Sequence, residues 1–486
     1  MKNMIKVATR AQIVSAEKKA TQDGTGESEL IERAALQLFS HFEKISEPNQ
    51  NSAIFVGGGN NGADGLSLAL LLQKSGYPFK VFIAADKMND ECCLYLDKID
   101  KKNIEKANPQ TIDLSSFDFI FDGILGTGCT RPIEGKIQKL INIINDSCAY
   151  KISIDIPSGL NADTGKAEGG AVISDETLTF CANKLGQLIC DGRNFCGKIT
   201  ICDIGVYLSE STAEVIDEEI VKLPLRKTVS HKGNYGSVAI IAGSPTMVGG
   251  ALLAHESAAV ALKSGCGYSY LCVPRSLASA YQSRVREEML YLLPDIGGKL
   301  IFEKEAFLEI LQKTKTVVIG MGLGQNENVI EILKYLSMQD ITLVIDADGL
   351  NALARDINAL NGHKCKLILT PHVGEFRRLS GCRTFKNDAE AVKALAKELN
   401  CVIAMKSATT IISDGDKVFL NITGTPAMAK AGSGDVLAGM VGAFASMSNP
   451  LIAAIRACYY FGKAGERAAT DLSEHSVLAS DIIIRL

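Results

Sequence analysis

A run of small residues ending in an acid lies near the C-terminus, Ala431-Gly-Ser-Gly-Asp435, and an apolar stretch follows it. Small residues before an apolar helical run place backbone N–H groups at a helix N-terminus, where they can hold a phosphoryl group. Asp435, in the first helical turn, could accept the proton of a hydroxyl whose oxygen attacks phosphorus. The plainer alternative is an acid that only complements the helix dipole. We favour phosphoryl-transfer chemistry.

Four further motifs accompany this loop. Lys406-Ser-Ala-Thr-Thr410 offers a cation and hydroxyls suited to nucleotide phosphates, and Thr370-Pro-His372-Val-Gly-Glu375 offers an imidazole at the same expected edge of a sheet. Gly320-Met-Gly322-Leu-Gly324 is a glycine-rich strand end, and Gly249-Gly-Ala251 opens a helix. A lone histidine is more often structural, but beside these loops a binding role for His372 is the better interpretation.

The N-terminal half carries three motifs that each follow a predicted strand. They are Gly57-Gly-Gly-Asn-Asn-Gly-Ala-Asp-Gly65, Asp122-Gly-Ile-Leu-Gly-Thr-Gly-Cys-Thr-Arg131-Pro and Asp155-Ile-Pro-Ser158-Gly-Leu. Open α/β sheets bind ligands at the carboxyl ends of their strands. Each motif alone is compatible with a simple turn, but the three together indicate a site for an anionic ligand and a cation.

The elements that must position these motifs alternate along the chain. In the first half, apolar runs predict strands over 52–56, 79–84, 117–121 and 151–154, and helical spacing predicts helices over 27–43 and 64–74. In the second half, strands are predicted at 237–242, 316–319, 342–345, 366–369 and 402–405, with helices over 251–263, 327–337 and 388–399 and a hairpin over 410–420. This alternation predicts two α/β domains with parallel sheets, divided near residues 222–226.

Composition excludes several classes of protein. The 486 residues, 47% hydrophobic and 22% charged, predict two or three globular domains, and the net charge of −4 argues against general nucleic-acid binding. No apolar run is long enough to cross a membrane, and no signal peptide is recognisable. The fourteen cysteines form no CxxC pair and read as buried thiols of a reducing cytoplasm. We therefore expect a cytoplasmic enzyme that acts on small molecules.

The three N-terminal motifs resemble the epimerase domain of the bifunctional NAD(P)H-hydrate repair enzymes, of the YjeF type. The resemblance covers roughly residues 1–222, within a Rossmann-like fold. It implies that Asp155 contacts the hydrated dinucleotide as acid or base, and that K⁺ is held by Asn61, Asp122 and Ser158. It also implies substrate contacts at Asn60, Asn61, Gly62, Ala63, Asp64, Gly126, Thr127, Gly128, Cys129, Thr130, Arg131 and Pro132. The segment Ile31-Glu-Arg-Ala-Ala35 departs from the family's usual helix ending and bears on packing.

The second half, residues 223–486, resembles the ribokinase-like superfamily and, within it, the ADP- or ATP-dependent NAD(P)H-hydrate dehydratases. The motif His231-Lys-Gly-Asn-Tyr-Gly joins the two loops around His372 and Asp435 in that signature. The resemblance implies that the hydrate is bound by Ala251, Gly322, His372 and Asp435. It implies that the nucleotide is bound by Lys406, Ser407, Ala408, Thr409, Thr410, Thr425, Pro426, Ala427, Met428, Ala429, Lys430, Ala431, Gly432, Ser433 and Gly434.

Two departures affect the nucleotide loop. Thr425 stands where the family usually has Asn, and Ala427 stands where it usually has Gly, which reaches positive φ more easily. The resemblance implies ADP or ATP as phosphoryl donor, Mg²⁺, and a homo-oligomer. A ribokinase-like small-molecule kinase and a non-catalytic binding module remain the alternatives.

Overall fold

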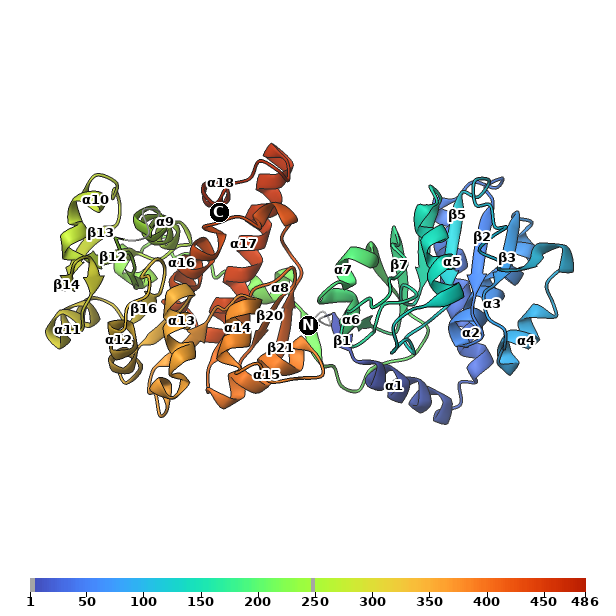
Figure 1. The fold of residues 1–486 in the computed structure, drawn as a ribbon, viewed down its shortest axis with the longest axis horizontal. Helices are drawn as coiled ribbons and strands as arrows, with labels where there is room; N and C mark the ends of the chain where they lie inside the picture. The colour runs from blue at the N-terminus through green and yellow to red at the C-terminus, as the bar shows by residue number, and fades with distance from the viewer. Residues whose placement is uncertain (1–4, 246–249) are drawn as a thin grey trace. The chain divides into compact units, whose positions relative to one another are not determined.

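The computed structural model describes residues 5–245 and 250–486, and the side chains of residues 250–255 lie outside that description (Figure 1). Two compact units divide the chain between Glu214 and Val215. The sequence placed the division at residues 222–223 instead. Residues from Val215 onward group with the second unit because Ile216 donates a hydrogen bond to the carbonyl of Leu420 and Tyr460 donates one to the carbonyl of Val221.

The first unit is built on a seven-stranded parallel sheet in the order β4-β3-β2-β5-β6-β7-β9. The chain order reverses between β2 (Ser52–Val56) and β5 (Phe119–Gly123), the place where open α/β sheets commonly bind ligands. The other elements are β1 (Lys6–Ala8), α1 (Arg10–Gln22), α2 (Glu27–Ile45), α3 (Asn60–Ser75), β3 (Phe79–Ile83), α4 (Asp90–Leu96), β4 (Ile104–Lys106), α5 (Gly135–Asp146), β6 (Tyr150–Ile154), β7 (Glu176–Phe180), β8 (Asn183–Lys184), α6 (Leu185–Leu188), α7 (Gly192–Phe195), β9 (Lys198–Cys202) and β10 (Ala213–Val215), with a 3-10 turn at Lys101–Asn103.

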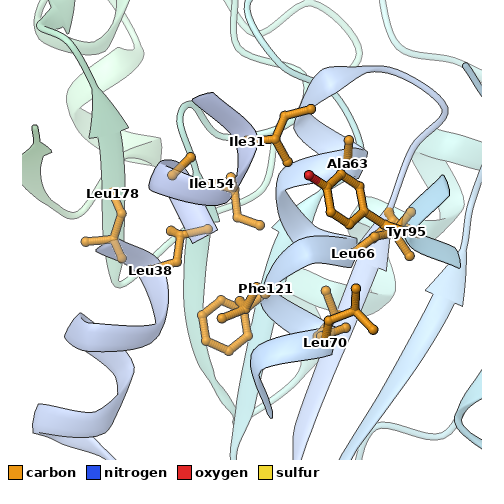
Figure 2. Packing of buried hydrophobic residues seen from close by; sticks show 14 of the residues in the cluster. Ile31, Leu38, Ala63, Leu66, Leu70, Tyr95, Phe121, Ile154 and Leu178 are labelled. Atoms are coloured by element: carbon orange, nitrogen blue, oxygen red, sulfur yellow. The ribbon is translucent and has the colours of Figure 1, made fainter. Parts of the chain in front are cut away.

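Alternating strand residues supply a core on each face of this sheet. On one face, Leu38 of α2 and Leu66 of α3 pack with Phe121 and Ile154 of the central strands (Figure 2). On the other face, α5 covers the sheet with its own apolar side. Helices α2 and α3 thus fix the position of the loop between β2 and α3, which carries the first glycine-rich motif.

In the described residues, the main sheet of the second unit runs in the order β13-β12-β11-β16-β17-β18-β19-β20-β21. The first seven are parallel, and β20 and β21 continue antiparallel as the expected hairpin. The strands are β11 (Ser237–Ile241), β12 (Tyr268–Pro274), β13 (Met289–Leu293), β16 (Thr316–Ile319), β17 (Thr342–Ile345), β18 (Lys366–Leu369), β19 (Val402–Met405), β20 (Thr410–Ser413) and β21 (Val418–Asn421), and a separate hairpin pairs β14 (Asp295–Ile296) with β15 (Lys299–Leu300).

The helix α16 (Ser433–Ala445) is the most buried helix of this unit, lying against α9, α17 and the central strands. The other helices are α8 (Glu218–Val221), α9 (Gly250–Lys263), α10 (Ala278–Gln282), α11 (Lys304–Lys313), α12 (Asn328–Ser337), α13 (Ala347–Arg355), α14 (Val373–Leu379), α15 (Asp388–Glu398), α17 (Pro450–Leu472) and α18 (Ala479–Ile484), with 3-10 turns at Lys232–Tyr235, Arg275–Leu277, Ile357–Leu360 and Pro426–Met428.

The predicted α/β class with two parallel sheets is confirmed. The helix predicted over 64–74 begins earlier, because α3 starts at Asn60. Ala63 donates its backbone N–H to the carbonyl of Gly59, which closes the first helical turn. The glycines in this segment made it look like a loop in the sequence. Within the part of the chain that the structure describes, no helix has the length and apolar content needed to cross a bilayer.

The aromatic packing of α2 gives a test of the first core. Phe42 is fully buried and its ring meets those of Tyr77, Phe119 and Phe121 at centroid distances of 5.2, 5.2 and 5.7 Å. We expect Phe42→Ala to lower the free energy of unfolding of this unit by about 3–5 kcal/mol, measured by urea titration with circular dichroism. Leu36→Ala on the same helix, at a side chain 54% exposed, is the control and should change it by no more than about 0.5 kcal/mol. Equal losses in both variants would contradict this packing.

Candidate functional site

The glycine loop after β2 is tightly enclosed by neighbouring backbone. A Cβ on Gly57 would lie 1.8 Å from the carbonyl oxygen of Ile124, and one on Gly58 would lie 2.0 Å from that of Lys87. Gly59 instead has open space around it and precedes α3 with no side-chain cap. The first two glycines are therefore required by loop packing, whereas the uncapped N–H groups at the start of α3 suit an anion.

The three predicted potassium ligands come together around the loop after β5. The side-chain amide of Asn61 donates to the carbonyl of Leu125 at 3.1 Å, and the Ser158 hydroxyl contacts the same carbonyl at 3.2 Å. Ser158 also donates to Asp122 through its hydroxyl and its backbone N–H, at 2.5 and 2.8 Å. The Asn61 Oδ1 atom is buried without a hydrogen-bond partner among the described residues. Burial raises the pKa of Asp122 despite these hydrogen bonds.

The predicted substrate loop 126–132 begins against Asn61, since a Cβ on Gly126 would lie 3.2 Å from the Asn61 Cβ. Its later residues, including Thr130 and Arg131, are exposed. Asn60 is also exposed, and its amide is held by Glu27 and Asn89 at 2.7 and 2.9 Å. Ala63 differs from the rest, because its side chain is buried in the core and only its backbone can meet a ligand.

Asp155 is held against a buried lysine that the sequence did not single out. Asp155 follows β6 with a left-handed φ of 65°, and its Oδ1 accepts from Lys184 and from the backbone N–H of Phe180. Lys184 is fully buried and also donates to Thr179 and to the carbonyl of Phe180, at 2.8 and 2.9 Å. Gln187 donates to the Asp155 carbonyl at 2.8 Å. The carboxylate therefore has a fixed position and a cationic partner beside it.

Two further carboxyl groups face this pair. Asp64, in α3, is buried, and burial followed by the charges of Asp155 and Glu17 raises its pKa well above its usual range. Glu17, in α1, has its pKa raised by burial and by Asp155. Ionising them costs more than ionising solvated carboxyls, so they hold protons more readily. This arrangement combines an Asp–Lys pair with groups able to supply a proton.

The predicted phosphoryl site of the second unit lies at the N-terminus of α16. Gly432 is the N-cap with a φ of 90°, and Asp435 lies in the first turn. The Ser433 hydroxyl is buried and lacks a hydrogen-bond partner in the described part of the chain. Burial, and then the negative charge of Asp346, raise the pKa of Asp435 to about 7. Such a carboxyl can take up and release a proton near neutral pH.

Lys406 lies at this helix end and is paired with an aspartate. Its Nζ is 2.6 Å from Asp346 Oδ1 and 3.5 Å from where a Cβ on Gly434 would be. Asp346 is 2% exposed at the end of β17 and is followed by Ala347 with a φ of 47°. The predicted nucleotide cation is thus in place, but it is shared with Asp346, which the sequence analysis missed.

The His372 loop adjoins Lys406 through a backbone bridge. His372 caps α14, its Nδ1 accepting from Gly374 at 2.9 Å, and Glu375 accepts from the His372 backbone N–H at 2.8 Å. Burial raises the pKa of Glu375. The Nδ1 atom is committed to the cap, and Nε2 lies 3.5 Å from Glu375 Oε1, so a ligand at Nε2 would have that carboxylate beside it.

The two departures in the nucleotide loop have a local explanation. Thr425 accepts from the Ala427 backbone N–H at 3.4 Å and donates to Glu474 at 3.1 Å. Ala427 is buried at an ordinary φ, and the positive φ of this loop is at Gly424, at 113°. Glycine is therefore not required at position 427. Of the other predicted residues, Gly322 takes a φ of 62°, and the Ala251 side chain lies outside the described residues.

The residues that the sequence missed carry weak local signals. Lys184 follows the strand β7 by only a few residues, and Asp346 comes directly after the strand β17. A buried lysine cannot be told from a surface lysine without knowing what packs over it. Of the predicted residues, Asn61, Asp155, His372 and Lys406 each lie just after a strand, at the carboxyl edge of the sheet of their own unit.

Comparison with known proteins identifies both units. Residues 238–485 match the family described as NAD(P)H-hydrate dehydratase, and residues 27–186 match the YjeF-related protein N-terminus. The structure titled ADP/ATP-dependent NAD(P)H-hydrate dehydratase from Bacillus subtilis, co-crystallised with ATP and Mg²⁺, is 28% identical and covers 55% of this chain and 94% of its own, with a TM-score of 0.47. The fold and both family matches define a two-domain α/β protein, with a YjeF-type unit followed by a unit of the NAD(P)H-hydrate dehydratase family.

Full-length relatives carry both units in the same order. The bifunctional NAD(P)H-hydrate repair enzyme of Moorella thermoacetica is 33% identical, with 93% of this chain and 90% of the relative covered. That of Thermofilum pendens is also 33% identical, with 96% and 93% covered. The chain belongs to the family of bifunctional NAD(P)H-hydrate repair enzymes. The family predicted from the motifs is therefore confirmed.

The buried carboxyl of Asp64 predicts a pH-dependent stability. Its pKa is raised in the folded protein, so it stabilises the fold when protonated, and that stability is lost as the pH rises through the folded pKa. Asp64→Asn should therefore raise the free energy of unfolding of this unit more at pH 8 than at pH 5, in urea titrations. Asp90→Asn, at an exposed acid in the first turn of α4, is the control and should show no such difference. A gain that is the same at both pH values would contradict the assignment.

Proposed function

We propose that this chain repairs hydrated NADH and NADPH with two activities. The first unit interconverts the R and S epimers of the hydrate, and the second dehydrates the S epimer with ADP as phosphoryl donor, giving NAD(P)H, AMP and phosphate. The observation that carries the proposal is Asp435, a buried carboxyl with a pKa raised to about 7 beside Lys406 and the N-terminus of α16. A small-molecule kinase is not favoured, because both units match the repair family.

In the second unit, the residues support removal of a hydroxyl by phosphorylation. Asp435 takes the proton from the C6 hydroxyl of the S hydrate, and that oxygen attacks the terminal phosphorus of the nucleotide. The N–H groups at the start of α16 and Lys406 bear the charge that develops on the phosphoryl oxygens. Phosphate then leaves C6 as the ring nitrogen supplies its lone pair, which gives an iminium, and loss of a proton from C5 restores the reduced nicotinamide.

In the first unit, Asp155 moves the proton that allows C6 to invert. Lys184 forms an ion pair with this carboxylate and fixes its position. Inversion requires either opening of the hemiaminal and reclosure or loss of the hydroxyl to an iminium, and both routes need a proton donor as well as a base. Asp64 and Glu17 are placed to serve as that donor.

The oxygen atoms around Asn61 fit a potassium ion. The buried Asn61 Oδ1 has no hydrogen-bond partner among the described residues. The Ser158 hydroxyl contacts both the Asp122 carboxylate and the carbonyl of Leu125, to which the Asn61 amide donates. Hard oxygen ligands suit such a cation. Bound there, K⁺ would supply positive charge to the start of α3, where substrate oxygens approach.

The nucleotide would bring Mg²⁺ with its phosphates. Across residues 5–245 and 250–486 the structure has no cluster of three His, Cys, Asp or Glu side chains able to hold a metal. ATP is the alternative donor to ADP, and we expect the active protein to be a homo-oligomer.

A mixture of both NADH hydrate epimers tests the two activities together. With Mg²⁺, K⁺ and ADP or ATP, the wild-type protein should return all of the substrate to NADH, followed at 340 nm. Asp155→Ala should convert only the S half rapidly, and Asp435→Asn should convert neither while still binding nucleotide. No recovery with either nucleotide would refute the proposed function. An unchanged use of the R epimer by Asp155→Ala would remove Asp155 from the mechanism.

The pKa of Asp435 sets the pH dependence of dehydration. The base must be ionised, so kcat/KM for the S hydrate should fall about tenfold per pH unit below about pH 7. Asp346→Asn should shift this acid limb to lower pH, because the charge of Asp346 contributes to the raised pKa. Asp348→Asn is the control, since Asp348 does not contribute to that pKa. An acid limb that stays near pH 7 in Asp346→Asn would contradict the electrostatic cause.

A further inference from the structure

A cavity of about 590 Å³ lies in the second unit beside the predicted hydrate site. It is lined by the loop that follows β16, by α13 and by the end of α14. Two arginines, Arg355 and Arg378, belong to its lining. Its size is in the range of small-molecule sites.

The cavity is continuous with the loops of Gly322 and His372. The backbone N–H of Gly324 donates to Asp348 Oδ2 at 2.8 Å, which joins the glycine loop to α13. A Cβ on Gly374 would lie 2.9 Å from Cε1 of His372 and 3.8 Å from Nη1 of Arg378. The Arg378 guanidinium and the His372 imidazole, which we expect to contact the hydrate, therefore both lie close to Gly374.

The charge of this cavity favours an anion. Arg378 is oriented by Asn351, whose Oδ1 accepts from it at 2.8 Å. In the described part of the chain neither arginine forms an ion pair, and Asp348 is engaged by Gly324 and by Asn351. Arginine binds phosphate oxygens in a planar, bidentate manner. Two guanidinium groups without carboxylate partners are suited to a diphosphate.

We propose that Arg355 and Arg378 bind the pyrophosphate of the hydrated dinucleotide while its nicotinamide end lies at Asp435. The proposal rests on the dehydratase function of this unit. It follows from the position of the cavity: in the proposed function the donor nucleotide lies at Lys406 and the start of α16, whereas the cavity extends from the loop after β16 along α13 to the end of α14 and is lined by neither of them. When the nicotinamide ring of the hydrated dinucleotide lies at Asp435, its pyrophosphate must extend away from the donor nucleotide.

Steady-state kinetics with three hydrates test this assignment. Arg378→Ala should raise KM about tenfold or more for the S hydrates of both NADH and NADPH, leave kcat within about twofold, and leave KM for ADP unchanged. The hydrate of reduced nicotinamide riboside, which has no phosphate, should be used equally by the variant and the wild type. Arg378→Lys, which retains the charge but not the fork, should recover part of the affinity.

Two further variants guard against indirect effects. Arg355→Ala removes a charge that holds no side chain in place within the described residues, and it should raise KM in the same way even if Arg378→Ala disturbs α14. Arg377→Ala, at an exposed arginine of the same helix outside the cavity lining, is the matched control and should behave as wild type.

Several outcomes would overturn the proposal. A rise in KM confined to the NADPH hydrate would assign the arginines to its extra phosphate, and a rise confined to ADP would assign them to the donor. Unchanged kinetics in both variants would remove the arginines from binding. A wild-type protein without dehydratase activity would instead refute the proposed function itself.

Discussion

Each unit pairs a lysine with an aspartate at the carboxyl edge of its sheet, and the candidate chemistry of each site depends on that pair. The fully buried Lys184 holds Asp155 in the first unit, and the partly buried Lys406 holds Asp346 at 2.6 Å in the second. Leaving a buried member of either pair without its partner would be costly. Burial raises the pKa of Asp64 in one unit and of Asp435 in the other, and the aspartate of each pair raises it further.

Unusual backbone angles bring these charges to their positions. Asp155, directly after β6, and Ala347, the second residue after β17, both take left-handed φ values, at 65° and 47°. Such turns are strained for residues with a Cβ and persist only where the surroundings enforce them. For Asp155 the surroundings are the hydrogen bonds from Phe180 and Lys184 to its carboxylate and from Gln187 to its carbonyl. The packed sheet thus holds each acid at the edge where a ligand enters.

Much of the fold could be predicted from local patterns. The strands at 52–56, 316–319 and 402–405 have the predicted limits, because short, wholly apolar runs leave little choice in a doubly covered sheet. The strands β7 and β9 were not anticipated, since polar threonines interrupt their pattern. The start of α3 was misplaced because glycines and asparagines resemble a loop until the core around Ala63 is known.

The sequence by itself determined the family, the α/β class and the acids Asp155 and Asp435, because motif spacing and strand periodicity are local properties of the chain. Only the tertiary structure decided which cations face those acids and which glycines serve packing. It brought Lys184 and Asp155 together, placed Asp346 on Lys406, and turned Arg378 toward the His372 loop. These contacts depend on burial and on distances between separate strands, and the spacing of residues along the sequence determines neither.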